Sequence, residues 1–208
     1  MRLIMLRALC MTLVLIAALE TGAVAMDTTL TANMNVDDAF SFYISTDDSV
    51  AGTFIGSGSA WWATDTFNVN LTPGVTNYLH IMASDVYGTI AMVIGDFSLS
   101  DANFQFANGT QTLLTDVTDW GVNLTGFGNP YSTPLSWGAN GCCPQYWGTL
   151  GVDASAQFIW DPSECLYCTA YFSTPITPTD APVPEPSTWL LFGSGLAGLA
   201  YWRRRQSA

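Results

Sequence analysis

The fold of this chain is indicated most clearly by residues 66–83, TFNVNLTPGVTNYLHIMA. Apolar and polar side chains alternate over residues 66–72, and the alternation returns over residues 78–83 after a turn at Pro73-Gly74. A period of two puts the apolar side chains on one face of a β-strand, whereas a helix repeats about every 3.6 residues. This stretch therefore predicts two strands joined by a turn.

Similar short runs recur along the chain and are separated by Gly, Asn, Asp or Pro. They cover residues 39–45, 89–94, 120–124 and 156–160. No stretch outside the two ends of the chain shows sustained helical periodicity. The pattern predicts an all-β domain over residues 26–173, folded as an antiparallel β-sandwich. Trp120 and Trp160 lie on these strand patterns and are expected in the core.

Charge is distributed unevenly over the 208 residues. Arginine occurs only at the two ends, and there is no Lys or Arg between Arg7 and Arg203. Residues 27–182 contain 15 Asp or Glu side chains. Nucleic acid is excluded as a partner because neutralising phosphates needs a basic surface, and anionic substrates are disfavoured for the same reason.

Residues 1–25 have the features of a signal peptide. Arg2 and Arg7 precede an apolar run at residues 8–19, and Ala23-Val24-Ala25 provides a small-x-small cleavage site. The alternative is a permanent N-terminal anchor, for which the apolar run is short. We therefore expect the protein to be exported from the cytoplasm.

The C-terminal end has three parts. Residues 174–187 are rich in proline and predict a semi-rigid extended stalk. Residues 188–202 are apolar and predict a short transmembrane helix, and the basic residues 203–208 are expected on its cytoplasmic side.

The order of these parts resembles a known sorting signal. Pro184, Glu185 and Pro186, then the apolar run, then three closing arginines are similar to the PEP-CTERM signal of Gram-negative bacteria. The resemblance implies a membrane-anchored precursor that an exosortase-type enzyme recognises and cleaves near this motif. It also implies a final location at the cell surface or in the extracellular matrix. A GPI signal is the rival, but such a tail should not end in a basic cluster.

The body of the chain resembles galactose-binding-like jelly-roll domains. The order of elements carries this resemblance, through residues 37–44, 55–62, 67–83, 114–120, 158–161 and 170–172. It implies a jelly-roll β-sandwich and a carbohydrate ligand. Gly121 stands where these domains usually have a Lys, so a sugar site that uses Arg or Lys is excluded.

Four cysteines follow the signal peptide, at Cys142, Cys143, Cys165 and Cys168. Exported proteins meet oxidising conditions, so an even number predicts two disulfides. Adjacent cysteines bridge each other only with strain, and we therefore expect Cys142 and Cys143 each to pair with Cys165 or Cys168. The alternatives are a four-thiolate zinc site and a redox-active Cys-x-x-Cys.

Three tryptophans in loop-like sequence, Trp62, Trp137 and Trp147, are predicted to stack on polysaccharide. Asp37 and Asp38 suit a structural calcium ion, and the alternative is that they are surface carboxylates that maintain solubility. No other cofactor is predicted. His80 is the one histidine and is expected to be structural or solvated.

The sequence shows no catalytic motif of the G-x-S-x-G or H-E-x-x-H type. We therefore predict a non-enzymatic surface protein that binds exopolysaccharide. The alternative is a structural or adhesion protein of the matrix that binds proteins and no sugar. A glycosidase is the third hypothesis, although no pair of carboxylates stands out in the sequence.

Overall fold

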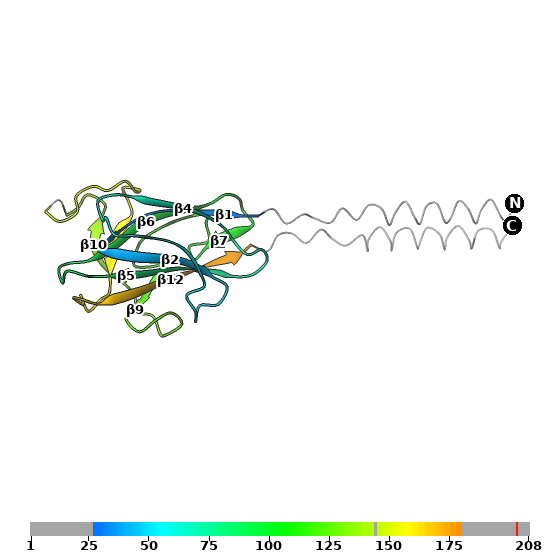
Figure 1. The fold of residues 1–208 in the computed structure, drawn as a ribbon. Helices are drawn as coiled ribbons and strands as arrows, with labels where there is room; N and C mark the ends of the chain where they lie inside the picture. Colours follow the sequence, from blue (N-terminus) through cyan, green and yellow to red (C-terminus); the bar gives the residue numbers. More distant parts are fainter. Residues whose placement is uncertain (1–26, 144, 180–202, 204–208) are drawn as a thin grey trace.

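The computed structural model describes residues 27–143, 145–179 and 203. Within these residues the chain forms two antiparallel β-sheets of six strands each, which face one another as a sandwich (Figure 1). The predicted all-β, antiparallel sandwich is therefore confirmed. The predicted signal peptide, the sorting motif at residues 184–186 and the apolar segment at residues 188–202 lie outside the described residues.

The first sheet contains, in spatial order, β10 (Leu135–Ala139), β11 (Gln157–Trp160), β6 (Met92–Leu99), β1 (Thr29–Asp37) and β4 (Asp65–Asn70), with β8 (Thr112–Leu114) also paired to β6. The second sheet contains β3 (Thr53–Gly58), β2 (Ala39–Ser45), β5 (Asn77–Ser84), β12 (Thr169–Pro178) and β7 (Phe104–Phe106), with β9 (Gly121–Asn123) also paired to β12. No helix in the described part of the chain is long and apolar enough to cross a bilayer.

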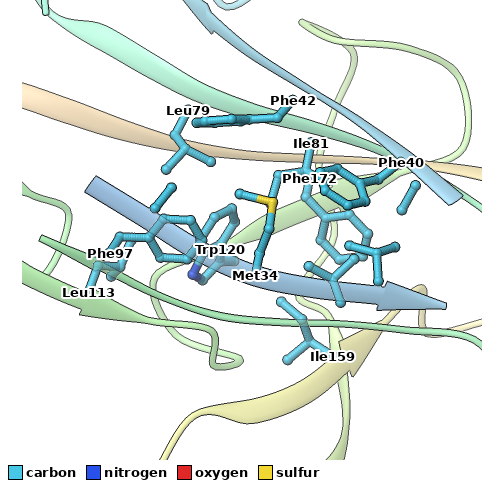
Figure 2. Packing of buried hydrophobic residues seen from close by; sticks show 14 of the residues in the cluster. Met34, Phe40, Phe42, Leu79, Ile81, Phe97, Leu113, Trp120, Ile159 and Phe172 are labelled. Carbon is cyan, nitrogen blue, oxygen red and sulfur yellow. The ribbon is translucent and has the colours of Figure 1, made fainter. Parts of the chain in front are cut away.

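The core lies between the two sheets and is built by alternate side chains of their strands. Figure 2 shows Phe42, Ile81 and Phe172 of the second sheet directed toward Met34 and Ile159 of the first, and all five are fully buried. Trp120 and Trp160 are buried as predicted, 3% and 1% exposed. Apolar burial of this extent is the main favourable term in folding.

The two strands predicted within residues 66–83 both form, but they belong to different sheets. β4 pairs with β1 in the first sheet, and β5 lies between β2 and β12 in the second. Residues 71–76 therefore cross from one sheet to the other. The buried Asn77 side chain holds this crossing, because its amide accepts from Thr72 N at 2.9 Å and donates to the carbonyls of Thr72 and Val75.

The last strand continues beyond the expected domain boundary at residue 173. β12 extends to Pro178 and pairs with β5 and β7, so residues 174–178 of the expected stalk lie in the sheet. Thr174 and Ile176 alternate with more exposed neighbours and are fully buried. The prolines at positions 175 and 178 fit this strand because their fixed φ is compatible with extended backbone.

Both ends of the described body meet at one end of the sandwich (Figure 1). Ser100 N donates to Thr29 O, and Thr179 N donates to Asn103 O, each at 2.9 Å. The opposite end, which we call the distal end, is formed by the connections that follow β1, β5 and β11. Asp38 N donates to Ser84 O there, and Asp85 N donates to Cys168 O.

Shortening Ile176 tests whether residues 174–178 belong to the core. We expect Ile176→Ala to lower the free energy of unfolding by about 2–5 kcal/mol, because the missing atoms leave a cavity. Val75→Ala is the matched control at a residue that is 43% exposed, and its expected effect is within about 0.5 kcal/mol. Urea unfolding followed by tryptophan fluorescence measures both. If the two substitutions lowered the free energy of unfolding by equally small amounts, Ile176 would belong to the stalk and not to the core.

Candidate functional site

A cavity of about 460 Å³ opens at the distal end of the sandwich, and we call it the distal cleft. The end of β1, the β3–β4 loop, the β5–β6 loop and the β10–β11 loop all contribute to it. Its described lining consists of Asp37, Trp61, Thr89, Ile90, Gln145, Tyr146 and Trp147. A cavity of this size with an apolar wall and a few polar groups has the usual make-up of a small-molecule site.

Aromatic rings form most of the wall. Trp147 is 6% exposed and packs against Phe158 with ring centroids 5.0 Å apart. Tyr146 is 54% exposed and lies beside Trp147. On the other side Trp61 meets Trp62 edge to face at 5.6 Å, and Trp62 is 66% exposed. The cleft thus has a rigid floor at Trp147 and exposed rings at its rim.

The β10–β11 loop reaches the cleft because it covers the outer face of the first sheet. Met92 and Ile94 of β6 and Phe158 of β11 form a second apolar cluster with Trp147 and Leu150. Asn140 closes the loop, since its amide donates to the carbonyls of Leu150 and Val152 and accepts from Leu150 N at 2.8 Å. These contacts fix the position of Trp147.

The three tryptophans predicted to bind sugar occupy different positions. Trp147 lines the cleft, whereas Trp62 is outside the lining and packs against Trp61, which belongs to it. Trp137 is half-buried against the second apolar cluster and is also outside the lining. Sequence reasoning missed Trp61 and Tyr146, although the adjacent pair Trp61-Trp62 was a usable signal because neighbouring aromatics in a loop seldom both enter a core.

Asp37 is the one carboxyl group among the described residues that line the cleft. It is 9% exposed, and its Oδ2 accepts a hydrogen bond from Trp147 Nε1 at 2.8 Å. Burial raises the pKa of Asp37 to about 7, and the neighbouring Asp38 contributes in the same direction. The side chain therefore changes charge close to neutral pH.

Asp38 and Asp85 hold the loops around the cleft. Burial opposes ionisation of Asp38, but hydrogen bonds from Asp37 and from the N–H groups of Val86 and Tyr87 keep its pKa below the usual range. The carboxyl oxygens of Asp85 accept from Gly88 N at 2.7 Å and Tyr167 N at 2.9 Å. Asp38 thereby joins the β1–β2 connection to the β5–β6 loop, and Asp85 joins the β5–β6 loop to the β11–β12 turn.

The calcium site expected at Asp37 and Asp38 stays a prediction. Across residues 27–143 and 145–179, no group of three or more His, Cys, Asp or Glu side chains is arranged to hold a metal ion. Indole and backbone N–H groups already donate to these two carboxylates. These donors reach Oδ2 of each carboxyl group, so both side chains also organise the surrounding loops.

The cysteines are within disulfide distance as predicted, but the expected partners were wrong. Cys142 pairs with Cys143, and Cys165 pairs with Cys168. A turn in which Cys142 N donates to Ala139 O leads into the first pair, and a turn in which Glu164 N donates to Asp161 O comes directly before the second. Both pairs join cysteines that are close in sequence.

His80 is buried on the outer face of the second sheet, away from the distal cleft. Its ring stacks on Phe127 with centroids 4.0 Å apart, and its Nε2 lies 3.0 Å from Asp48 Oδ1. Tyr131 and Ser173 donate to the same oxygen at 3.1 and 2.7 Å. The carboxylate stands between Ser173 and His80, so these residues do not form a nucleophile–base pair. Of the two alternatives expected for His80, structural or solvated, its burial excludes the second.

A second cavity, of about 340 Å³, lies beside the β2–β3 loop at the end opposite the distal cleft. Its described lining has no aromatic ring and includes Ser45, Asp47 and Thr53. Without a flat apolar surface it offers less to an organic ligand, and the distal cleft remains the better candidate site.

Comparison with known proteins matches a family model to the tail of the chain. One family model, the PEP-CTERM protein-sorting motif, matches residues 182–205. The match implies an exported chain whose membrane-anchored precursor is processed for the cell surface by an exosortase-type enzyme. No curated protein matches the chain, and no solved structure matches it.

The ionisation of Asp37 gives the stability of the fold a pH dependence with a definite sign. Its pKa rises from 3.8 to about 7 on folding, so the folded chain holds the proton more tightly and loses stability as the pH rises between these values. Asp37→Asn removes this loss and still offers Trp147 an oxygen acceptor. We therefore expect the stability of the variant, relative to the original chain, to increase from about pH 4 to about pH 8.

Asp47→Asn is the control for this measurement, followed by urea unfolding at each pH. Hydrogen bonds from Ser49 lower the pKa of the exposed Asp47, so its substitution should bring no gain at the higher pH. A stability difference for Asp37→Asn that stays flat across this range would contradict the assignment.

Proposed function

We propose that this protein is an exported surface protein that binds carbohydrate in the distal cleft without catalysing a reaction. The sorting motif supports delivery to the cell surface. The order of strand motifs supports a sandwich of the galactose-binding-like, jelly-roll type. The extracellular matrix of a Gram-negative bacterium is the setting that this combination favours, with an exopolysaccharide as the ligand.

The observation that carries the proposal is the composition of the cleft wall. Trp61, Tyr146 and Trp147 present aromatic surface next to Asp37 and Gln145, which can bond hydroxyl groups. The face of an aromatic ring carries partial negative charge and attracts the weakly positive C–H groups on one side of a sugar ring. The volume of about 460 Å³ suits one or two sugar units.

The absence of catalysis is supported by the number of carboxyl groups in the cleft. Hydrolysis of a glycosidic bond usually needs two, one on each side of the scissile bond. Among the described residues that line the cleft, Asp37 is the only carboxylic acid, and it already bonds Trp147. Asp38 is committed to backbone N–H groups.

The position of the cleft suits a surface protein. Thr179 lies at the end of the sandwich opposite the cleft and precedes the sorting tail by a few residues. A precursor anchored through that tail would therefore hold the cleft away from the membrane, where it can meet polymers outside the cell.

Protein binding is the second candidate, because exposed apolar side chains gather at the same end. Tyr87 and Tyr167 are 72% and 73% exposed, and Leu166 is 55% exposed. Interfaces are enriched in such aromatic residues. These three lie on the loops beside the cleft, so an adhesion surface without sugar specificity would use the same end of the sandwich.

A glycan array followed by titration calorimetry tests sugar binding. We expect Tyr146→Ala and Trp61→Ala each to weaken binding at least tenfold, about 1.4 kcal/mol, because each removes a stacking surface. Phe54→Ala is the matched control, since Phe54 is 56% exposed on β3, outside the cleft. Saturable binding to matrix proteins, with no glycan bound, would instead establish the second candidate.

The sorting motif is tested separately in the native host. Replacing Pro184, Glu185 and Pro186 with alanine should leave the C-terminal segment attached and the chain in the membrane fraction, because the processing enzyme loses its recognition sequence. Mass spectrometry of the C-terminus distinguishes the two forms. A tail removed equally from the variant and the original chain would contradict a role for this motif.

A further inference from the structure

We propose that the distal cleft selects glycans that carry a free, protonated amino group over neutral and acidic glycans. The expected ligand is a polymer containing unacetylated hexosamine units. This inference rests on the proposed function, since it names the class of sugar that the same cleft would bind.

The first argument is the charge around the cleft. Asp37 lies in its wall, and Asp38 and Asp85 are hydrogen-bonded into the loops beside it. The sequence has no Lys or Arg between Arg7 and Arg203. His80 is buried on the second sheet against Asp48 and does not line the cleft. The field in the cleft is therefore set by carboxylates, which attract a cation and repel a uronic acid.

The second argument is the protonation state of the Asp37 carboxyl group. Its Oδ2 accepts from the indole of Trp147, a neutral donor, and its side chain is largely buried. Burial raises the pKa of Asp37 to about 7, and Asp38 acts in the same direction, so the hydrogen bond from Trp147 offsets only part of the cost of ionising Asp37. An ammonium group in the cleft would offset the rest of that cost and would drive the proton off Asp37.

The third argument is the aromatic wall itself. A cation is also attracted to the faces of Trp and Tyr rings, most strongly where water is displaced. Trp61 and Tyr146 stand in the same lining as Asp37, so one amino sugar could stack on a ring and place its ammonium group near the carboxylate. A neutral N-acetyl group offers neither interaction and leaves Asp37 protonated.

The test compares two hexasaccharides with one backbone, the β-1,4-linked glucosamine hexamer and its fully N-acetylated form. The full-length chain, purified in a mild detergent, is titrated with each near pH 6 in two buffers that differ in ionisation enthalpy. We expect the free amine to bind at least tenfold more tightly, more weakly as salt is added, and with release of a proton. We expect the acetylated hexamer to release none, and oligogalacturonate to bind least.

Asp37→Asn should abolish both the preference for the free amine and the proton release. Asp47→Asn makes the same charge change at the other end of β2 and should alter neither. Proton release and salt dependence are measured on the unsubstituted chain, so the test stands even if Asp37→Asn fails to fold. Equal affinity for the two hexamers would overturn this inference and leave the proposed function intact. Binding of no glycan at all would overturn both.

Discussion

The constraint on which this structure depends is that neutral N–H groups hold the carboxyl groups of the distal end, in a sequence that has no Lys or Arg between Arg7 and Arg203. Asp37 accepts from the indole of Trp147, Asp38 from the backbone of Val86 and Tyr87, and Asp85 from Gly88 and Tyr167. Hydrogen bonds of this kind are short and directional. These hydrogen bonds fix the loops of the distal end, and ion pairs between surface side chains contribute little to this.

The same arrangement links the fold to the proposed function. Donors that hold a carboxylate in position without cancelling its charge leave a negative field in the cleft, next to the aromatic rings of the same lining. Trp147 contributes to both the fold and the cleft, because its ring closes the second apolar cluster and its Nε1 orients Asp37. The sandwich provides a rigid base for this loop assembly at the end opposite the one that leads to the sorting motif.

Much of the sheet structure followed from local patterns. Residues 39–45 form β2 as predicted, residues 78–83 lie in β5, and residues 156–160 overlap β11. The run at residues 89–94 enters a strand only at Met92, because the preceding residues form the loop beside the cleft. The proline-rich composition after residue 173 hid the end of β12, where Ile176 completes the core.

The sequence by itself determined the strand character of the body, its acidic charge and the sorting tail, because each is a property of neighbouring residues. The tertiary structure decided how distant segments meet. It placed the two strands of residues 66–83 in opposite sheets and joined Asp37 to Trp147 across 110 positions. A cleft built from the end of one strand and three separate loops has no local pattern, since its geometry depends on how two sheets pack.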